Sequence, residues 1–215
     1  MTASVAILDY GSGNLRSAQR ALERTGADVT VTSDLQEALN ADGLVVPGVG
    51  AYEACMKGLR EVRGERIIGR RLAGGRPVLG ICVGMQILFE ESSEFGPVRG
   101  LGVLPGRVVR FRANGVKIPH MGWNALRIRS RVPALDGVAD GTYVYFVHSY
   151  YAEPADPALI AATSDYGGCE FTAAVARDNL FATQFHPEKS QAAGLGILQN
   201  FVRAAAPSPR VAVSA

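Results

Sequence analysis

The chain has 215 residues, of which 47% are hydrophobic and 20% are charged, and its formal net charge is +2. This composition excludes the low hydrophobicity and high net charge of a disordered chain. The balanced charge does not indicate a nucleic-acid or membrane-surface protein, and no uncharged stretch is long enough for a transmembrane helix. No basic residue precedes the first apolar run, so we expect no secretory signal and a cytoplasmic location. Three cysteines without C-x-x-C spacing argue against a disulfide framework.

The first 90 residues alternate short apolar segments with amphipathic ones. Strands are predicted at residues 4–8, 28–32, 43–46 and 77–81, and helices at 15–24, 34–39, 53–73 and 83–91. Strands that lack polar alternation and are separated by helices form parallel sheets covered on both faces. We therefore expect an α/β fold with a doubly wound, mostly parallel sheet flanked by helices.

The second half of the chain has a different pattern. Residues 102–132 alternate over short distances, and further strands are predicted at 143–147, 173–177 and 180–185. Arginines at every second position of 126–132 favour the solvated face of an outer strand over a nucleic-acid surface, because edge charges also discourage edge-to-edge pairing. A closing helix is predicted at 194–206. Residues 207–215 carry no core pattern, so we expect one domain over 1–206 and a frayed tail after it.

The segment Gly80-Ile81-Cys82-Val83-Gly84 places a cysteine between two glycines, at the junction of a predicted strand and a predicted helix. This is the arrangement of a nucleophile elbow, in which the glycines leave room for a sharp turn. Cys82 would then lie at a helix N-terminus, where the dipole and free N–H groups favour the thiolate. The Val83 N–H would face an oxyanion formed at Cys82. The alternative is a structural cysteine, which is the expectation for Cys55 and Cys169.

A cysteine nucleophile needs a base, and the base needs a group that orients it. His186 and Glu188 follow the predicted strand 180–185, with Pro187 between them. In an extended chain, residues two apart share a face, so Glu188 could hold one imidazole nitrogen while the other faces Cys82. The alternative chemistry is a metal site with Cys82 as the third ligand. The elbow explains Cys82 without a metal, so we expect neither a metal nor a cofactor.

Cys82 within GICVGMQ, and His186 and Glu188 within HPEKS, together resemble the class I glutamine amidotransferases. Four further segments are similar to one branch of that family, the glutaminase subunits of imidazole glycerol phosphate synthase: DYGSGNL from Asp9, PGVG from Pro47, PHMGWN from Pro119 and YFVHSY from Tyr145. The resemblance covers nearly the whole chain. It implies a triad of Cys82, His186 and Glu188 on a doubly wound α/β fold that carries a smaller antiparallel sheet.

The resemblance also implies a reaction and the residues that serve it. Glutamine would be hydrolysed to glutamate through a thioester on Cys82, with His186 first protonating the leaving ammonia and then acting as base. The oxyanion would be bound by the backbone of Val49, Gly50 and Val83. In relatives, a peptide of the segment that corresponds to Val49 and Gly50 can point the wrong way until the partner subunit has bound its ligand. The implied glutamine-binding residues are Gly50, Gln86, Glu94, Ser149 and Tyr150. The implied partner contacts are Asn14, Met121, Trp123, Tyr145 and Lys189. For Glu94 the alternative is a solvated carboxylate, and for Trp123 it is a core position.

Ammonia in neutral water is mostly protonated, so a glutaminase that feeds a synthesis needs a sheltered path to the acceptor. The sequence has no G-x-x-x-x-G-K-[ST] loop and no spare α/β unit for a phosphorylated substrate. By resemblance, the acceptor lies on the cyclase subunit HisF, a (β/α)₈ barrel that receives ammonia through a channel and makes imidazole glycerol phosphate and AICAR in histidine biosynthesis. The two subunits would form a heterodimer. Two alternatives stay open: the glutaminase of another class I amidotransferase, such as pyridoxal phosphate synthase, and a catalytically silent binding subunit.

Overall fold

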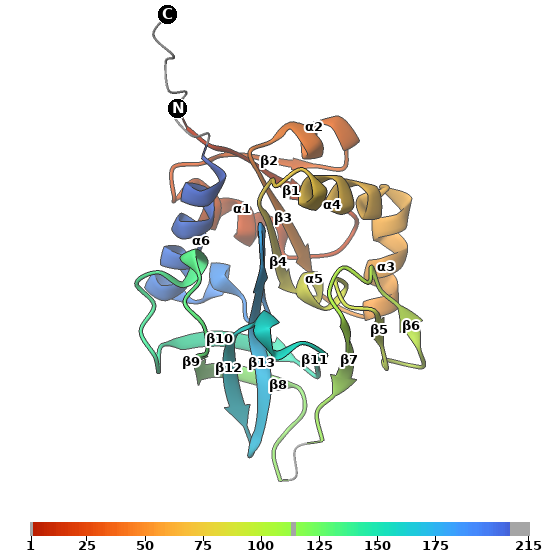
Figure 1. Ribbon diagram of the computed structural model, residues 1–215, viewed down its shortest axis with the longest axis vertical. Coiled ribbons are helices and arrows are strands. Elements are labelled where there is room, and N and C mark those ends of the chain that lie inside the picture. The colour runs from red at the N-terminus through yellow and green to blue at the C-terminus, as the bar shows by residue number, and fades with distance from the viewer. Residues whose placement is uncertain (1, 113–114, 207–215) are drawn as a thin grey trace, which may run out of the picture.

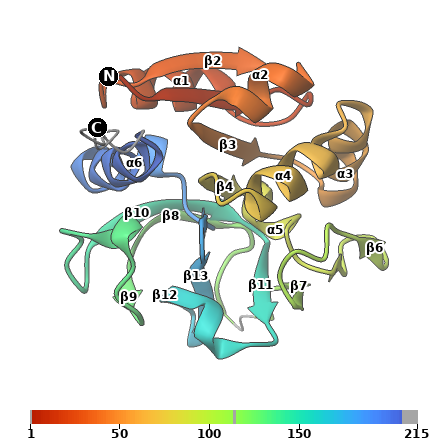
Figure 2. The ribbon, with the colours of Figure 1, turned by 45° about the horizontal axis from the view of Figure 1, so that its top comes forward.

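The computed structural model describes residues 2–112 and 115–206, so the predicted tail at 207–215 lies outside the described residues. The predicted α/β core is present as an eight-stranded sheet in the order β2-β1-β3-β4-β14-β13-β12-β9 (Figures 1 and 2). The first five strands in this order are parallel, and the last three are antiparallel. The parallel strands are β1 (Ser4–Leu8), β2 (Asp28–Thr32), β3 (Gly43–Gly48), β4 (Val78–Cys82) and β14 (Leu180–Thr183). Every residue of β3, β4 and β14 is buried, which explains their unbroken apolar runs.

Helices cover the parallel strands on both faces. They are α1 (Leu15–Glu23), α2 (Leu35–Asn40), α3 (Tyr52–Glu61), α4 (Gly64–Ala73), α5 (Val83–Gln86) and α6 (Gln191–Ala205). Figure 1 shows α1 and α6 on one side of the central strands and α3 and α4 on the other. Within residues 2–112 and 115–206, no helix is both long and apolar enough to span a bilayer.

Two of the predicted helices were wrong in extent. The segment predicted as one helix at 53–73 is split between α3 and α4 at Arg63, which has φ +57°. The turn brings Gly64 so close to Leu59 that a Cβ on Gly64 would lie 2.3 Å from Leu59 Cδ1. The helix predicted at 83–91 ends at Gln86, because the carbonyl groups of Ile87, Leu88 and Phe89 accept hydrogen bonds from the loop 101–104 instead of continuing the helix.

The antiparallel half of the molecule is more extensive than the sequence pattern indicates. It adds β13 (Cys169–Arg177), β12 (Ile160–Tyr166) and β9 (Arg127–Ile128) to the large sheet. Two small sheets pair β8 (His120–Ala125) with β10 (Tyr143–His148), and β11 (Tyr150–Pro154) with β7 (Gly106–Arg110), β5 (Glu91–Ser92) and β6 (Val98–Arg99). Strands β11 and β12 were not predicted, since Pro154 and the buried Thr163 and Ser164 interrupt the apolar pattern.

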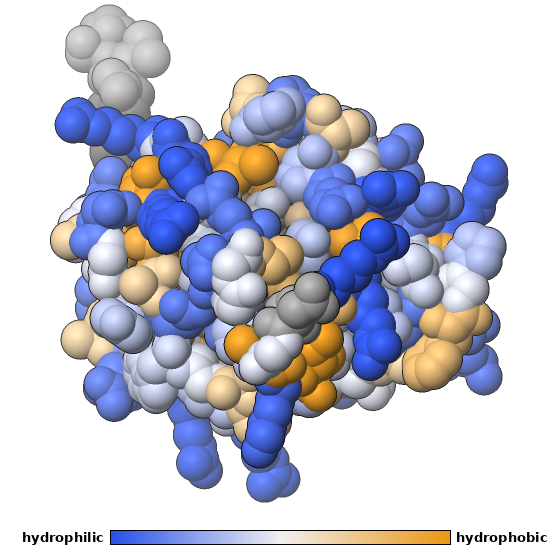
Figure 3. Space-filling view, turned by 90° about the horizontal axis from the view of Figure 1, so that it is seen from below, coloured by the Kyte–Doolittle hydropathy of each residue, from blue (hydrophilic) through white to orange (hydrophobic). Residues whose placement is uncertain are grey.

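The arginine-rich segment lies at the sheet edge, as predicted for an outer strand. β9 pairs only with β12 in the large sheet, and Arg127 and Arg129 are exposed. Both guanidinium groups form ion pairs with Glu170 on β13, and the Arg127 distance is 3.1 Å. Seen from below, the molecule is mostly hydrophilic, with separate apolar areas (Figure 3). Arg127 and Arg129 therefore lie on a solvent-exposed sheet edge, and their charges are paired with Glu170 of the same chain.

Candidate active site

Cys82 lies on a sharp turn between β4 and α5, at the carboxyl end of the parallel sheet. Its φ of +57° and ψ of −113° are rare for a residue with a side chain. A Cβ on Gly84 would lie 1.9 Å from the carbonyl oxygen of Val46, and one on Gly80 would lie 2.8 Å from the oxygen of Gly84. The predicted strand, turn and helix are thus present. However, α5 has only four residues, so its dipole is weaker than the longer predicted helix implied.

His186 and Glu188 contact each other directly beside this turn. His186 Nδ1 lies 2.7 Å from Glu188 Oε1, and both side chains are almost fully buried. The contact does not arise from the extended chain that the sequence argument assumed, because Pro187–Lys189 forms a 3₁₀ turn after β14. Ser190 braces this turn: its hydroxyl donates to the His186 carbonyl at 2.7 Å and accepts from the Tyr145 N–H at 2.9 Å.

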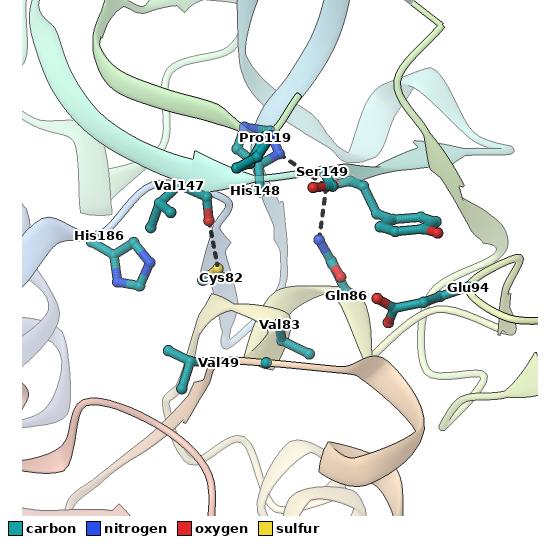
Figure 4. Close-up of a pocket in the computed structure, with 12 residues that line it drawn as sticks. Val49, Cys82, Val83, Gln86, Glu94, Pro119, Val147, His148, Ser149 and His186 are labelled. Atoms are coloured by element: carbon teal, nitrogen blue, oxygen red, sulfur yellow. Dashed lines mark hydrogen bonds between the residues drawn. The ribbon is translucent and has the colours of Figure 1, made fainter. Parts of the chain in front are cut away.

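The free nitrogen of the His186 ring is available to the thiol. His186 Nε2 is buried and has no hydrogen-bond partner among the described residues, and the ring faces Cys82 in Figure 4. Burial lowers the pKa of His186, but its contacts with Cys82 and Glu188 outweigh burial and raise that pKa to about 10. A raised pKa means that the imidazolium is stabilised by the negative charges around it. The arrangement therefore favours a protonated imidazole between the Cys82 thiol and the Glu188 carboxylate.

A cavity of about 240 Å³ opens above Cys82 (Figure 4). It is lined by Val49, Gly50, Cys82, Val83, Gln86, Glu94, Pro119, Val147, His148, Ser149, Tyr150 and His186. All the residues expected to bind glutamine or its oxyanion are among them. Glu188 lies behind His186, outside the lining. The cavity is of a size that suits a small polar molecule rather than a polymer.

Two polar side chains at the far end of the cavity are held in place by the protein. Glu94 Oε2 accepts a hydrogen bond of 2.6 Å from the Tyr52 N–H at the start of α3, so Glu94 is not a freely solvated carboxylate. Gln86 Nε2 donates to the Tyr150 carbonyl at 2.9 Å and to Gln184 Oε1 at 3.0 Å. Both amide protons of Gln86 are thus used within the protein, and its oxygen remains for a ligand.

The two expected oxyanion segments differ in the state of their N–H groups. Val83 is the first residue of α5, so its N–H has no acceptor within the helix. The Val49 N–H instead donates to Ser12 Oγ at 3.1 Å, and the Val49 carbonyl accepts from Ser12 Oγ at 2.7 Å and Cys55 Sγ at 3.4 Å. Val49 therefore lines the cavity, while its N–H is bound to Ser12 and is not directed at Cys82, the resting orientation that the resemblance allowed for.

Three of the expected partner-contact residues form one cluster next to the site, in which Trp123 and Lys189 are exposed and Tyr145 is half-buried. The rings of Trp123 on β8 and Tyr145 on β10 lie 6.0 Å apart, and Lys189 Nζ lies 5.9 Å from the Tyr145 ring centre. Trp123 is 45% exposed, so the alternative of a core tryptophan is wrong. Met121, on the same strand, is 63% exposed, and Asn14 precedes α1 as its N-terminal flanking residue.

Comparison with known proteins identifies the family. The family description "Glutamine amidotransferase class-I" matches residues 6–205. The chain belongs to the class I glutamine amidotransferases. The imidazole glycerol phosphate synthase subunit HisH of Geobacter metallireducens is 52% identical over 205 residues, which cover 93% of this chain and 97% of that protein. HisH of Nocardia farcinica is 56% identical over 206 residues, with the same coverage of 93% and 97%.

Within the amidotransferases, the chain is a glutaminase subunit of the imidazole glycerol phosphate synthase type, so a partner subunit is implied. The glutaminase domain of Trypanosoma brucei CTPS aligns with a TM-score of 0.68 at 17% identity, covering 95% of this chain and 94% of that one. At that identity the likeness concerns the fold alone. It agrees with the doubly wound sheet and the smaller antiparallel sheets described above.

Sequence reasoning missed several residues of the site. Ser12, His148 and Gln184 all contact residues expected to act there. One signal for Gln184 was present, since it is an amide in the mostly apolar run 180–185 before His186. Across residues 2–112 and 115–206, no three His, Cys, Asp or Glu side chains are grouped so that they could hold a metal ion.

Proposed function

We propose that this amidotransferase hydrolyses the side-chain amide of L-glutamine at Cys82 and delivers the ammonia to the cyclase subunit HisF of imidazole glycerol phosphate synthase. The observation that carries the proposal is the geometry of Cys82: a thiol on a strained turn that lines a small cavity and faces an imidazole held by a buried carboxylate. This is the arrangement of an activated cysteine nucleophile.

In the proposed reaction the Cys82 sulfur attacks the amide carbon of glutamine. The C–N bond breaks as the His186 imidazolium gives its proton to the leaving nitrogen, and ammonia departs from a thioester. A water molecule then attacks the thioester carbon while neutral His186 takes its proton, and the C–S bond breaks to release glutamate. Glu188 stabilises the imidazolium from behind, and the Val83 N–H donates to the oxyanion in both steps.

The cavity wall supplies contacts for the rest of the substrate. The Glu94 carboxylate matches the α-ammonium of glutamine, and the Gln86 oxygen together with the backbone of Ser149 and Tyr150 offers polar partners for its amino-acid end. Gly50 leaves the entrance open, because no atom lies within 4 Å of where its Cβ would be. The residues proposed to bind the substrate glutamine thus surround one cavity and differ in charge and hydrogen-bonding character.

The cluster of Trp123, Tyr145 and Lys189, together with Met121 on the same strand as Trp123, supports the proposed contact with the cyclase. Large side chains such as Trp123 and Met121 that remain exposed beside a cavity are typical of a protein interface. A partner seated there would cover the cavity and keep ammonia from bulk water. A cytoplasmic location belongs to the same proposal, since all three cysteines are free thiols, as expected in a reducing compartment.

The test replaces Cys82 with alanine in the complex with the cyclase. The C82A complex should lose glutamine-dependent synthesis by at least about 10³-fold, yet retain synthesis from added ammonium salt. The matched control is Cys169→Ala, which removes a thiol on β13 outside the cavity and should leave both activities unchanged. Loss of both activities in C82A would assign Cys82 a structural role and contradict the proposal.

A further inference from the structure

Gln184 connects the nucleophile to the substrate cavity. It directly follows β14, two residues before His186, and its side chain is fully buried, with 0% exposure. Its Nε2 lies 3.7 Å from Cys82 Sγ, and its Oε1 accepts the 3.0 Å hydrogen bond from Gln86 Nε2. The second bond fixes the orientation of the amide: because the oxygen faces Gln86, the nitrogen and its protons face the sulfur.

The chain of hydrogen bonds continues beyond Gln86 into a buried histidine pair. The Tyr150 carbonyl, which accepts from Gln86, also accepts from His148 Nδ1 at 2.9 Å. His148 Nε2 is then the acceptor for His120 Nδ1 at 3.1 Å. Burial lowers the pKa of His148 to about 3 and that of His120 to about 4, so both rings are neutral at pH 7. The donor and the acceptor of each hydrogen bond in this series are therefore fixed.

We propose that Gln184 is a positioning residue that serves both ends of the site: its amide N–H donates to the Cys82 sulfur, and its amide oxygen locks Gln86 with the oxygen of Gln86 turned to the substrate. The inference rests on the proposed function, because it assigns a role within the same glutaminase site.

The effect on the sulfur follows from the two groups on either side of it. Cys82 Sγ lies 3.9 Å from the Val147 carbonyl, which can accept the proton of the neutral thiol. Gln184 can only donate to the sulfur, and a donor stabilises the thiolate more than the thiol. The Val147 carbonyl thus favours the protonated thiol of Cys82, and the Gln184 N–H favours the thiolate. Because Gln184 is buried, water cannot replace its hydrogen bond to the sulfur.

The effect on Gln86 follows from the two hydrogen bonds that its amide nitrogen donates. An amide with both protons engaged presents only its oxygen to the cavity. Without Gln184, one amide proton of Gln86 loses its partner, and the side chain can rotate so that nitrogen and oxygen exchange places. Substrate affinity should then decrease, in addition to any change at the sulfur.

The test measures the thiol directly. In Gln184→Leu, which keeps the side-chain volume but removes both polar atoms, the pH midpoint for alkylation of Cys82 by iodoacetamide should move up by about one unit. The rate at each pH is followed by mass spectrometry of the Cys82 peptide in the full chain. The titratable groups around the sulfur include His186 and Glu188 after β14, Tyr10 after β1, Cys55 on α3, and Glu94 and His148 in the cavity wall, and none of them is altered.

A second variant separates the two roles and guards against misfolding. Gln184→Glu is isosteric and keeps an oxygen for Gln86, but an ionised carboxylate gives no proton to the sulfur and its negative charge also disfavours the thiolate. It should shift the alkylation midpoint upward while its glutamine KM stays within about twofold of wild type, whereas Gln184→Leu should raise KM about tenfold as a buried hydrogen bond is lost. The matched control is Thr183→Val, which removes the buried 2.9 Å bond from Thr183 to the Phe185 carbonyl and should leave the midpoint unchanged.

The possible outcomes separate this inference from the proposed function. A wild-type alkylation midpoint in both Gln184 variants, or an equal shift in Thr183→Val, would overturn the positioning role. If the wild-type complex hydrolyses no glutamine, the proposed function fails, but the alkylation profiles still report whether Gln184 acts on the thiol.

Discussion

The two backbone segments that meet at the cavity, the turn at Cys82 and the turn at Val49, are built in opposite ways. At the first, Gly84 and Gly80 touch neighbouring backbone so closely that neither has room for a methyl group. At the second, the space around Gly50 is open, and Val49 is 42% exposed. The nucleophile is thus fixed by packing, while the Val49 peptide is fixed by hydrogen bonds to Ser12 and Cys55.

This difference separates two requirements of the proposed catalysis. The proposed nucleophile, its proposed base and the Val83 N–H already lie around the cavity in the chain by itself. The Val49 N–H, one of the expected oxyanion donors, is instead bound to Ser12. One such donor contributes about 10²–10³ in rate. A partner that turns the Val49 peptide toward Cys82 would therefore activate an otherwise complete site, which agrees with a glutaminase that works only when its acceptor is ready.

The largest expected effect comes from breaking the packed turn. In Gly84→Ala the new Cβ would lie 1.9 Å from the Val46 carbonyl oxygen, which is backbone of a central strand and cannot move aside. We expect a loss of more than about 3 kcal/mol in the free energy of unfolding, measured by urea denaturation. The matched variant Gly50→Ala meets no atom within 4 Å and suffers only from its φ of +84°, so about 1–2 kcal/mol is expected. Equal losses would show that the two turns do not differ in packing.

A smaller effect is expected from the carboxylate behind the imidazole. In Glu188→Gln the negative charge that stabilises the imidazolium is removed, so the pKa of His186 should fall from its raised value. The imidazolium is present below that pKa and lost above it; hence the alkaline limb of the kcat profile should move to lower pH. At pH 7.5 kcat should decrease by about 10²-fold.

The measurement for this prediction is a pH–rate profile of the complex with glutamine. Glu153→Gln is the control, because Glu153 forms an exposed ion pair with Arg107 far from the triad and should leave the profile unchanged. An alkaline limb in Glu188→Gln that coincides with that of wild type would mean that Glu188 does not tune His186.

The contrast between the turns also explains how far the sequence could predict the site. Residue types report packing: the paired glycines around Cys82 and the apolar runs of β3 and β4 allowed the turn and the parallel sheet to be predicted. Contacts between distant segments leave weaker signals. The hydrogen bond from Val49 to Ser12 joins residues 37 apart, and the Gln184–Gln86 bond joins residues 98 apart. The direction of the Val49 peptide has no local pattern, and the position of Gln184 in a mostly apolar run does not reveal which residues its amide contacts.

The errors in the predicted elements have the same origin. Periodicity alone continues through Arg63 and past Gln86, because the apolar positions on both sides of each break remain buried. Contacts in the folded structure end these helices. Gly64 packs closely against Leu59, and N–H groups of the loop 101–104 donate hydrogen bonds to the carbonyl groups that follow Gln86. The His186–Glu188 contact was predicted, but from an extended chain rather than from the 3₁₀ turn that Pro187 begins.

The smallest expected effect tests the hydrogen bonds that hold the Val49 peptide. Ser12→Ala removes the acceptor of the Val49 N–H and one donor to the Val49 carbonyl, leaving only Cys55. Because a neutral hydrogen bond contributes about 1 kcal/mol, the glutaminase rate of the isolated chain should rise about fivefold. The rate of the ligand-loaded complex should change little, so the activation ratio decreases. Ser33→Ala, at an exposed serine, is the control. An isolated Ser12→Ala chain that is no faster than wild type would mean that Ser12 does not restrain the second oxyanion donor.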